Sequence, residues 1–121
     1  MKLDVLVVED SLTVIFVVET ALKECGLNYR IAKCVDEAVN FINEYEIGFI
    51  ILDVNLGDNE CGLDIIENCS PSKCRFIVHS TDNNKDIRER AVSLGALGFW
   101  KKPSSIDYLI TNINTIYNST E

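Results

Sequence analysis

The sequence predicts a doubly wound α/β fold, in which helices cover both faces of a five-stranded parallel sheet. Two observations lead to this prediction. Strand-like and helix-like patterns alternate five times along the 121 residues, as βα units do around a parallel sheet. The strand-like runs at 3–8 and 47–52 are dominated by apolar residues, which indicates strands buried on both faces. Because a chain of this length has room for one core, we expect a single domain over 1–121.

The first half of the chain predicts three strands and two helices. The strands are expected at 3–8, 29–34 and 47–52, and the helices at about 11–25 and 36–45. Ser11 can cap the first helix, and Gly26 can take the left-handed conformation that often ends a helix. Asp36 can cap the second helix. The more polar strand at 29–34 is expected at or near an edge of the sheet.

The second half predicts two further strands, at 75–78 and 97–100. A polar loop over 55–61 leads to a short helix at about 63–69, and longer helices are expected at about 85–94 and 104–117. Gly95 can end the helix before it, and Ser104 or Ser105 can cap the last helix. Periodicity alone does not decide the order of the strands in the sheet.

The composition excludes several classes of partner. The net charge is −8, with 19 acidic and 11 basic residues, and the basic residues are scattered. Since nucleic-acid binding requires clustered Lys and Arg, no direct nucleic-acid binding is expected. No apolar run approaches the roughly 20 residues that span a bilayer, and no secretory signal precedes the first strand. We therefore expect a cytoplasmic protein that does not associate with membranes.

The cysteines favour the same location. They form no CxxC pair, and an odd number fits a disulfide framework poorly. The five are Cys25, Cys34, Cys61, Cys69 and Cys74. We interpret them as reduced thiols, which are the rule in cytosolic proteins.

Chemically active side chains follow the predicted strands at the point where each strand ends. Glu9 and Asp10 follow the first strand, Asp53 the third, Ser80 the fourth and Lys102 the fifth. Each of these residues alone could be a helix cap, a turn residue or a solvated loop residue. Because the carboxyl ends of parallel strands meet at one edge, where open α/β sheets bind ligands, we expect all of them to share one pocket.

This set of side chains suits a divalent metal and a phosphoryl group. Three neighbouring carboxylates repel one another unless positive charge compensates them. Lys102 supplies one positive charge, and Mg²⁺ would supply two, with the oxygen ligands that it prefers. A metal beside a carboxylate also allows that carboxylate to attack phosphorus, because the metal neutralises charge on the transferring group.

The sequence resembles the receiver domain of response regulators over nearly its whole length. The matching segments are Val7-Val8-Glu9-Asp10-Ser11, Ile51-Leu52-Asp53-Val54-Asn55-Leu56, Val78-His79-Ser80-Thr81 and Gly95-Ala96-Leu97-Gly98-Phe99-Trp100-Lys101-Lys102-Pro103. Each motif is weak alone, but all of them in this order and at these separations are specific. The resemblance implies a flavodoxin-like fold, with five helices around a parallel sheet of strand order 2-1-3-4-5.

The resemblance also implies a role for each matching residue. It assigns metal binding to Glu9, Asp10, Asp53 and Asn55, phosphoryl transfer to Asp53, Ser80 and Lys102, and the conformational switch to Ser80 and Phe99. Asp53 would be the phosphoacceptor and Asp10 a direct Mg²⁺ ligand. Glu9 would act through metal-bound water, and Asn55 would offer its backbone carbonyl. Lys102 is preferred to its neighbour Lys101 because it directly precedes the proline.

The function so implied is a phosphorylation-dependent signalling switch of a two-component system. The donor would be a histidine kinase or a histidine phosphotransfer protein, and the output would be a downstream protein or a fused domain. The domain is not expected to be an enzyme in the usual sense, since it would catalyse phosphoryl transfer to, and hydrolysis from, its own Asp53. Whether the chain stands alone or is part of a longer protein stays open.

Other functions are compatible with parts of the pattern. A metal-dependent aspartyl-phosphate phosphatase is the main alternative, but it would need a second acid where Asn55 stands. A flavodoxin-like FMN carrier would need a Ser/Thr/Gly-rich loop after the first strand. A receiver fold that has lost phosphorylation is disfavoured because the whole set of acids, hydroxyl and lysine is present.

The sequence departs from the family pattern at a few positions near the site. Leu56-Gly57 stands where the family usually has a Met-Pro or Leu-Pro pair, and Thr81 stands where Ala or Gly is more common. Glu9 replaces the more common Asp. His79 precedes Ser80 on its strand and should point away from the pocket, so we expect a packed or surface residue and not a phosphodonor. We also expect Trp100 to be packed.

Two surfaces lead to expectations about partners. On the first helix, Val14, Val17 and Ala21 form a second apolar stripe beside the core-facing one, and we interpret it as the docking face for the phosphodonor. Residues 104–118 contain no Lys or Arg. The charged dimer interface of DNA-binding relatives would lack half its partners, so we predict a monomer.

Overall fold

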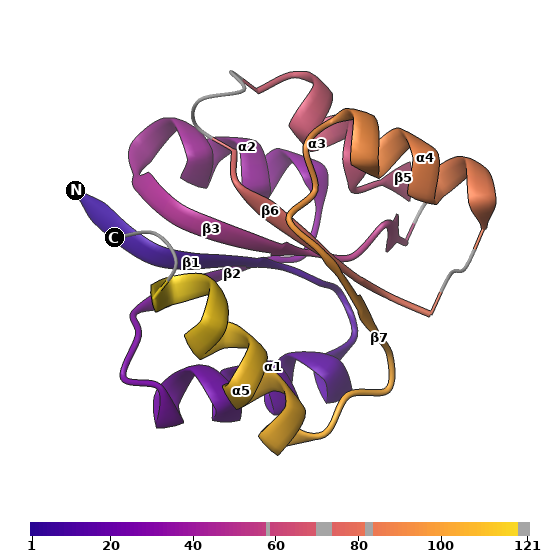
Figure 1. Cartoon of the computed structure of the whole chain (residues 1–121). Helices are drawn as coiled ribbons and strands as arrows, with labels where there is room; N and C mark the ends of the chain where they lie inside the picture. Colours follow the sequence, from indigo (N-terminus) through magenta and orange to yellow (C-terminus); the bar gives the residue numbers. More distant parts are fainter. Residues whose placement is uncertain (58, 70–73, 82–83, 119–121) are drawn as a thin grey trace.

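The fold is built on one parallel sheet of five strands, seen at the centre of Figure 1. The computed structural model describes residues 1–57, 59–69, 74–81 and 84–118. The strands lie in the order β2 (Tyr29–Ala32), β1 (Lys2–Val8), β3 (Glu46–Leu52), β6 (Phe76–Ser80) and β7 (Phe99–Lys101). All four neighbouring pairs are parallel. The expected order 2-1-3-4-5 is confirmed.

Five helices of the described part of the chain cover the two faces of this sheet (Figure 1). They are α1 (Leu12–Glu24), α2 (Val35–Glu44), α3 (Leu63–Glu67), α4 (Lys85–Ser93) and α5 (Ile106–Asn118). Helices α1 and α5 lie on one face, and α2, α3 and α4 on the other. The doubly wound α/β class is therefore confirmed. None of these helices is long and apolar enough to cross a membrane.

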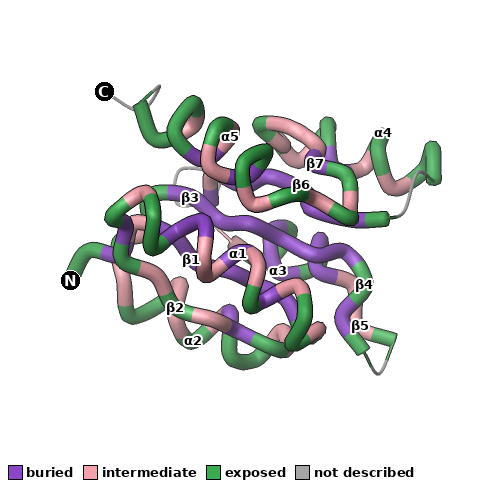
Figure 2. The backbone as a smooth tube through the Cα atoms, turned by 90° about the horizontal axis from the view of Figure 1, so that it is seen from below, coloured by how far each residue is buried: buried purple, intermediate pink, exposed green. Residues whose placement is uncertain are grey.

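Strands β1 and β3 have apolar side chains on both faces because helices cover both faces of the sheet. In β1, Val5 and Val7 belong to the hydrophobic cluster under α1 and α5, and Leu6 and Val8 belong to the cluster under α2, α3 and α4. All four are fully buried, and Figure 2 shows β1 and β3 as the buried centre of the molecule. Alternation between two cores accounts for the unbroken apolar run in the sequence.

The pairing register brings the ends of the strands together. Val8 of β1 pairs with Leu52 of β3, so Glu9 and Asp53 leave the sheet side by side. The backbone N–H of Asp53 donates to the carbonyl of Val8 at 2.9 Å. On the other side, the N–H of Lys102 donates to the carbonyl of Ser80 at 3.1 Å. The residues that follow four different strands therefore meet at one edge, as predicted.

Most helix ends are as the sequence predicts. The Ser11 side chain accepts a hydrogen bond from the N–H of Val14, and Gly26 and Gly95 have left-handed φ angles of 70° and 95°. Ser105 caps α5, because its hydroxyl accepts from the N–H of Tyr108 at 3.0 Å. These contacts satisfy backbone groups that the helix itself leaves unpaired.

The start of α2 and the 55–61 loop differ from the prediction. Helix α2 begins at Val35, so Asp36 lies in its first turn, where its charge favours the helix dipole, and it is not the cap. A side chain from outside the helix contributes instead, because Glu60 accepts from the N–H of Val35 at 3.2 Å. Glu60 lies in a small antiparallel ribbon, β4 (Asn55–Leu56) with β5 (Glu60–Cys61), within the stretch expected to be a loop.

The prediction that all five cysteines are reduced is wrong for one pair. Cys69 and Cys74 form a disulfide, with Cα atoms 6.5 Å apart, a separation that a disulfide can span. Cys25, Cys34 and Cys61 are free thiols. An odd count excludes a fully paired framework, but it does not exclude one local bond between residues that the chain brings together at the two ends of a short connection.

Candidate functional site

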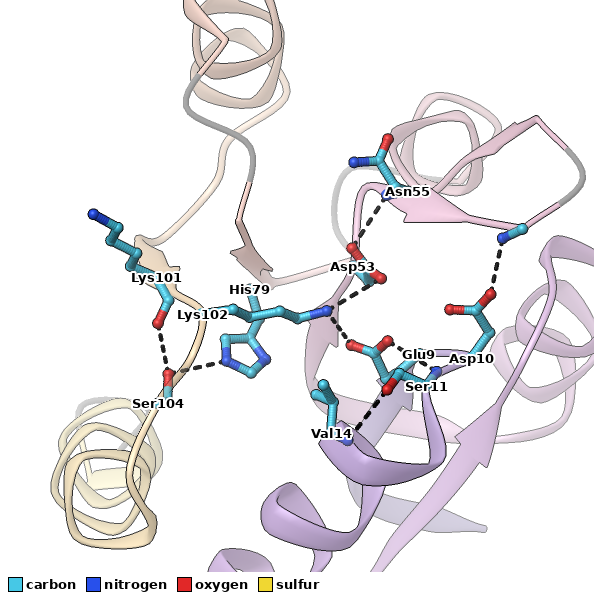
Figure 3. A network of polar contacts seen from close by, with 11 residues as sticks. Glu9, Asp10, Ser11, Val14, Asp53, Asn55, His79, Lys101, Lys102 and Ser104 are labelled. Carbon is cyan, nitrogen blue, oxygen red and sulfur yellow. Dashed lines mark hydrogen bonds and ion pairs between the residues drawn. The ribbon is translucent and has the colours of Figure 1, made fainter.

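Three carboxylates gather at the carboxyl edge of the sheet. Each of Glu9, Asp10 and Asp53 has an oxygen within 4.8 Å of an oxygen of the other two. Glu9 and Asp53 are only 2% and 6% exposed, whereas Asp10 is exposed. Figure 3 shows these side chains converging from the ends of β1 and β3. Carboxylates this close and this buried require positive charge nearby.

Lys102 provides one such charge from the opposite side of the pocket. Its Nζ lies 2.5 Å from Glu9 Oε1 and 3.2 Å from Asp53 Oδ2. Lys101 points away from the acids, and its carbonyl accepts a hydrogen bond from Ser104 (Figure 3). The side chain of Lys102, rather than that of Lys101, therefore enters the cluster.

One lysine does not fully compensate the three acids. Burial and the charge of Glu9 raise the pKa of Asp53 from 3.8 to about 6, although Lys102 and the N–H of Asn55 act in the opposite direction. The N–H of Asn55 donates to Asp53 Oδ1 at 3.1 Å. The result is a carboxylate that is costly to ionise in the absence of further positive charge.

The donor set fits a hard divalent cation. All the side-chain ligand atoms that Glu9, Asp10 and Asp53 offer are carboxylate oxygens, and the cluster holds excess negative charge. Mg²⁺ prefers oxygen ligands and usually keeps several waters. Of the three acids, Asp10 lines a hollow of about 650 Å³, together with Asn55, Ile87 and other residues. The cluster is thus open to solvent beside Asp10.

Ser80 and Phe99 lie on the same face of the sheet, on adjacent strands. Val78 pairs with Phe99 in register, and Ser80 lies two residues after Val78. Since alternate residues of a strand share a face, Ser80 and Phe99 both face the side covered by α4. Ser80 is 7% exposed, and Phe99 is half-buried against the cluster under α2, α3 and α4. The two predicted switch residues therefore share one face of adjacent strands, offset by two positions in the register.

A contact on Phe99 was not predicted from the sequence. The guanidinium of Arg88 in α4 lies over the Phe99 ring, 4.3 Å from its centre, in the geometry of a cation–π interaction. Arg88 belongs to no recognisable sequence motif and lies on a helix with several charged residues. Its role follows only from the packing of α4 against β7.

Gly62 is a second residue that the sequence did not indicate. A Cβ at this position would collide with the backbone carbonyl oxygen of Asp53, and the N–H of Gly62 donates to the carbonyl of Val54 at 2.8 Å. The glycine thus lets the chain before α3 pass close to the backbone of Asp53.

His79 and Trp100 are packing residues, as predicted. His79 is 3% and Trp100 6% exposed, and their rings meet edge to face with centres 6.5 Å apart. The Nε2 atom of His79 lies 3.0 Å from the hydroxyl of Ser104. Burial, followed by the charge of Lys102, lowers the pKa of His79 from 6.5 to about 4. His79 is therefore neutral at pH 7, and its side chain is too buried to contact a partner protein.

The predicted docking stripe on α1 is wrong. Ala21 is fully buried, and Val14 and Val17 are half-buried against the cluster that α1 shares with α5. Helix α5 packs along α1 (Figure 1), and its apolar residues share one hydrophobic cluster with this stripe. The exposed apolar residues of α1 are instead Leu12 and Phe16, which are 70% and 68% exposed.

Residues 5–114 match the family described as the response regulator receiver domain. The chain is 29% identical over 115 residues to an NtrX-like response regulator from Rickettsia felis, covering 90% of this chain and 24% of that protein. It is 30% identical over 113 residues to the two-component response regulator ARR2 from Arabidopsis thaliana, covering 89% and 17%. The chain thus spans about a quarter or less of the length of these relatives.

Solved structures with the same fold agree with this match. A CheY-like receiver domain protein from Methanospirillum hungatei superposes with a TM-score of 0.87 at 17% identity, over 98% of this chain and 96% of that one. A response regulator from Thermotoga maritima superposes with a TM-score of 0.82 at 28% identity, over 98% and 99%. The first likeness concerns the fold alone.

Proposed function

This chain belongs to the response regulator receiver domain family of two-component signalling, and we propose that it is a switch operated by phosphorylation of Asp53. The observation that carries this proposal is the position of the Asp53 carboxylate. It lies 3.2 Å from the ammonium of Lys102 and beside the carboxylates of Glu9 and Asp10, at the edge where the strands end. Acceptor, counter-charge and metal ligands are thus in one pocket.

The proposed reaction transfers a phosphoryl group from a phosphohistidine. An oxygen of the Asp53 carboxylate attacks phosphorus, a phosphorus–oxygen bond forms, and the bond from phosphorus to the histidine nitrogen breaks, leaving the imidazole of the donor. With a pKa of about 6, Asp53 is mostly ionised at pH 7 and can act as the nucleophile. The N–H of Asn55 holds Oδ1, and Lys102 contacts Oδ2, so both oxygens are oriented before the donor arrives.

Two side chains of this chain and a bound Mg²⁺ would stabilise the transferring group. In the proposal, Lys102 moves from the acids to one phosphoryl oxygen, and the Ser80 hydroxyl donates to another. Glu9, Asp10, Asp53 and the carbonyl of Asn55 would hold Mg²⁺, with Glu9 acting through water. When bound, the ion would neutralise charge on the phosphoryl oxygens, which is the main contribution a metal makes to phosphoryl transfer.

Ser80 and Phe99 would couple this chemistry to the surface. If Ser80 moves toward the phosphoryl group, space opens on the face that it shares with Phe99, and the ring can rotate into that space. The shared face and adjacent strands support this coupling. Phe99 would then leave the guanidinium of Arg88, so the surface formed by α4 and β7 would change. Such a local charge event with a distant surface change is typical of phosphorylation switches.

Leu12 and Phe16 are the proposed docking site for the phosphodonor. They are four residues apart and therefore share one side of α1, and both are highly exposed. Helix α1 starts two residues after Asp10, so a helix docked on this side would lie beside the acids. The partner would be a histidine kinase or a histidine phosphotransfer protein, and a downstream protein or a fused domain would receive the signal. A monomeric state and a cytoplasmic location are part of this proposal.

The alternative of an aspartyl-phosphate phosphatase is not favoured. It requires a second acid two residues after the nucleophile, and Asn55 occupies that position with an exposed side chain. Its N–H, rather than a carboxyl group, contacts Asp53.

The proposal is tested by the mass of the intact protein after incubation with acetyl phosphate and Mg²⁺. We expect one added phosphoryl group that requires Mg²⁺ and is removed by hydroxylamine, as an acyl phosphate is. The Asp53→Asn variant should gain none, and Asp107→Asn, which changes an exposed acid in the first turn of α5, should label like the wild type. Equal labelling of wild type and Asp53→Asn would exclude Asp53 as the acceptor.

A further inference from the structure

The backbone N–H of Gly57 donates a hydrogen bond of 3.0 Å to Oδ2 of Asp10, 47 residues away in the sequence. We propose that Gly57 is a positioning residue for the metal site, whose N–H orients the Asp10 carboxylate toward the other two acids. The inference rests on the proposed function, because it takes Glu9, Asp10 and Asp53 as the metal site.

The geometry around Asp10 supports this role. One oxygen of Asp10 accepts the N–H of Gly57, and the other turns toward Glu9 and Asp53 (Figure 3). Asp10 is the exposed member of the three acids, so burial does not restrict its rotation as it does for Glu9 and Asp53. A hydrogen bond to a charged carboxylate is among the stronger ones in proteins. It can therefore select one orientation of a side chain that would otherwise sample several.

Gly57 is well placed to act as a fixed donor. It directly follows β4, whose residues pair with β5, and its carbonyl accepts the N–H of Glu60 at 3.3 Å. Gly57 is thus held in place through Leu56 before it and through its own carbonyl. A Cβ on Gly57 would lie 3.1 Å from Asp10 Oδ2, so the carboxylate would have to shift slightly to accommodate it. Absence of a side chain and presence of an N–H both favour this contact.

The same position is one at which the chain departs from the family pattern. A proline at 57 has no N–H and could not make this bond. In this chain, the N–H of Gly57 therefore donates to a proposed metal ligand, which a proline at the same position could not do. Donors of this kind orient metal ligands, and their loss typically costs about 10–100-fold in metal affinity.

The test compares two variants that differ in the N–H. Gly57→Ala and Gly57→Pro both add a Cβ near Asp10, but the proline also replaces the N–H with its Cδ, so it removes the donor and adds a carbon toward Asp10. We expect calorimetric titration with Mg²⁺ to give a dissociation constant about ten-fold higher for Gly57→Pro than for Gly57→Ala, the low end of the outer-shell range because Asp10 is exposed. Melting temperatures in EDTA should differ little between the two variants, which separates metal positioning from a general loss of stability.

Equal Mg²⁺ affinity of the two variants, or tighter binding by Gly57→Pro, would overturn the inference while the proposed function stands. A wild type that binds no Mg²⁺ would overturn both. If Gly57→Pro does not fold, replacing the 56–57 amide by an ester, made by chemical ligation, removes the same donor without added bulk. The ester protein should also bind Mg²⁺ more weakly than the wild type, and unchanged affinity would overturn the inference.

Discussion

The Lys102 ammonium lies closer to Glu9 than to the proposed phosphoacceptor, at 2.5 Å from Glu9 and 3.2 Å from Asp53. One cation is thus shared between two buried carboxylates. Lys102→Met would leave both uncompensated, and we expect the free energy of unfolding in EDTA at pH 7 to fall by about 3 kcal/mol, the usual cost of breaking a buried ion pair.

Lys101 is the matched control for this prediction, because it is the neighbouring lysine and its side chain is exposed. Urea denaturation of Lys101→Met should agree with the wild type within about 0.5 kcal/mol, as for most surface changes. If the two lysine variants lose the same stability, the shared ion pair is not what stabilises the pocket.

The pH dependence of stability reports on Asp53. Its folded-state pKa is raised from 3.8 to about 6, by burial first and then by Glu9, so the folded protein holds this proton more tightly than the unfolded chain. The contribution of Asp53 to the free energy of unfolding is complete below the pKa that it has in the unfolded chain. It is lost as the pH rises through its pKa in the folded protein. At about 1.4 kcal/mol per unit, it amounts to at most about 3 kcal/mol.

We therefore expect the stability of metal-free wild type, relative to Asp53→Asn, to fall between about pH 4 and 6. Denaturant titrations in EDTA across this range measure the difference. A flat difference for Asp53→Asn would mean that Asp53 does not titrate as described.

His79 should have the opposite effect over an overlapping range. Burial, and then Lys102, lowers its pKa from 6.5 to about 4, so the folded protein resists protonation of this ring. Its contribution to stability is fully present above the pKa of His79 in the unfolded chain. It is lost as the pH falls through the pKa of His79 in the folded protein. The stability of wild type relative to His79→Gln should therefore rise between about pH 4 and 6.5. The same denaturant titrations measure this, and a falling difference would contradict the buried, neutral state of His79.

Phe16 should matter for transfer from a protein donor and not for transfer from a small molecule. Phe16→Glu places a charge in the proposed docking site, and we expect phosphotransfer from the cognate kinase to slow at least about ten-fold, the effect of about 1.4 kcal/mol. Acetyl phosphate labelling should be unchanged. Val92→Glu is the control, since Val92 is also an exposed apolar residue, at 62%, but lies on α4. Equal slowing by both variants would mean that Phe16 has no special role in docking.

The sequence predicted the sheet and the pocket because both depend on local pattern. Apolar runs placed the central strands, and parallel pairing then brought the residues after β1, β3, β6 and β7 to one edge. The positions of Glu9, Asp53 and Lys102 follow from that rule without any knowledge of side-chain packing.

The features that were missed depend on contacts between distant segments. The carboxylate that accepts the N–H of Val35 at the start of α2 comes from Glu60 in another element, and the N–H of Gly57 contacts Asp10, 47 residues away in the sequence. The apolar stripe with Val17 was correctly found, but amphipathicity does not tell which neighbour covers a face. In this fold the neighbour is α5. The Cys69–Cys74 bond was missed because a rule based on the number of cysteines cannot find a single local pair.

Chemical reduction of the phosphorylated protein can locate the phosphorylated residue. Borohydride reduces an acyl phosphate to an alcohol, so a phosphorylated aspartate becomes homoserine. After reaction with acetyl phosphate and Mg²⁺, reduction and peptide mass spectrometry should find homoserine at position 53 and unmodified Glu9 and Asp10. Phosphorylation of Asp53 would be contradicted by reduction at Glu9 or Asp10 with Asp53 intact. It would also be contradicted if a protein that has gained a phosphoryl group contains no reduced residue.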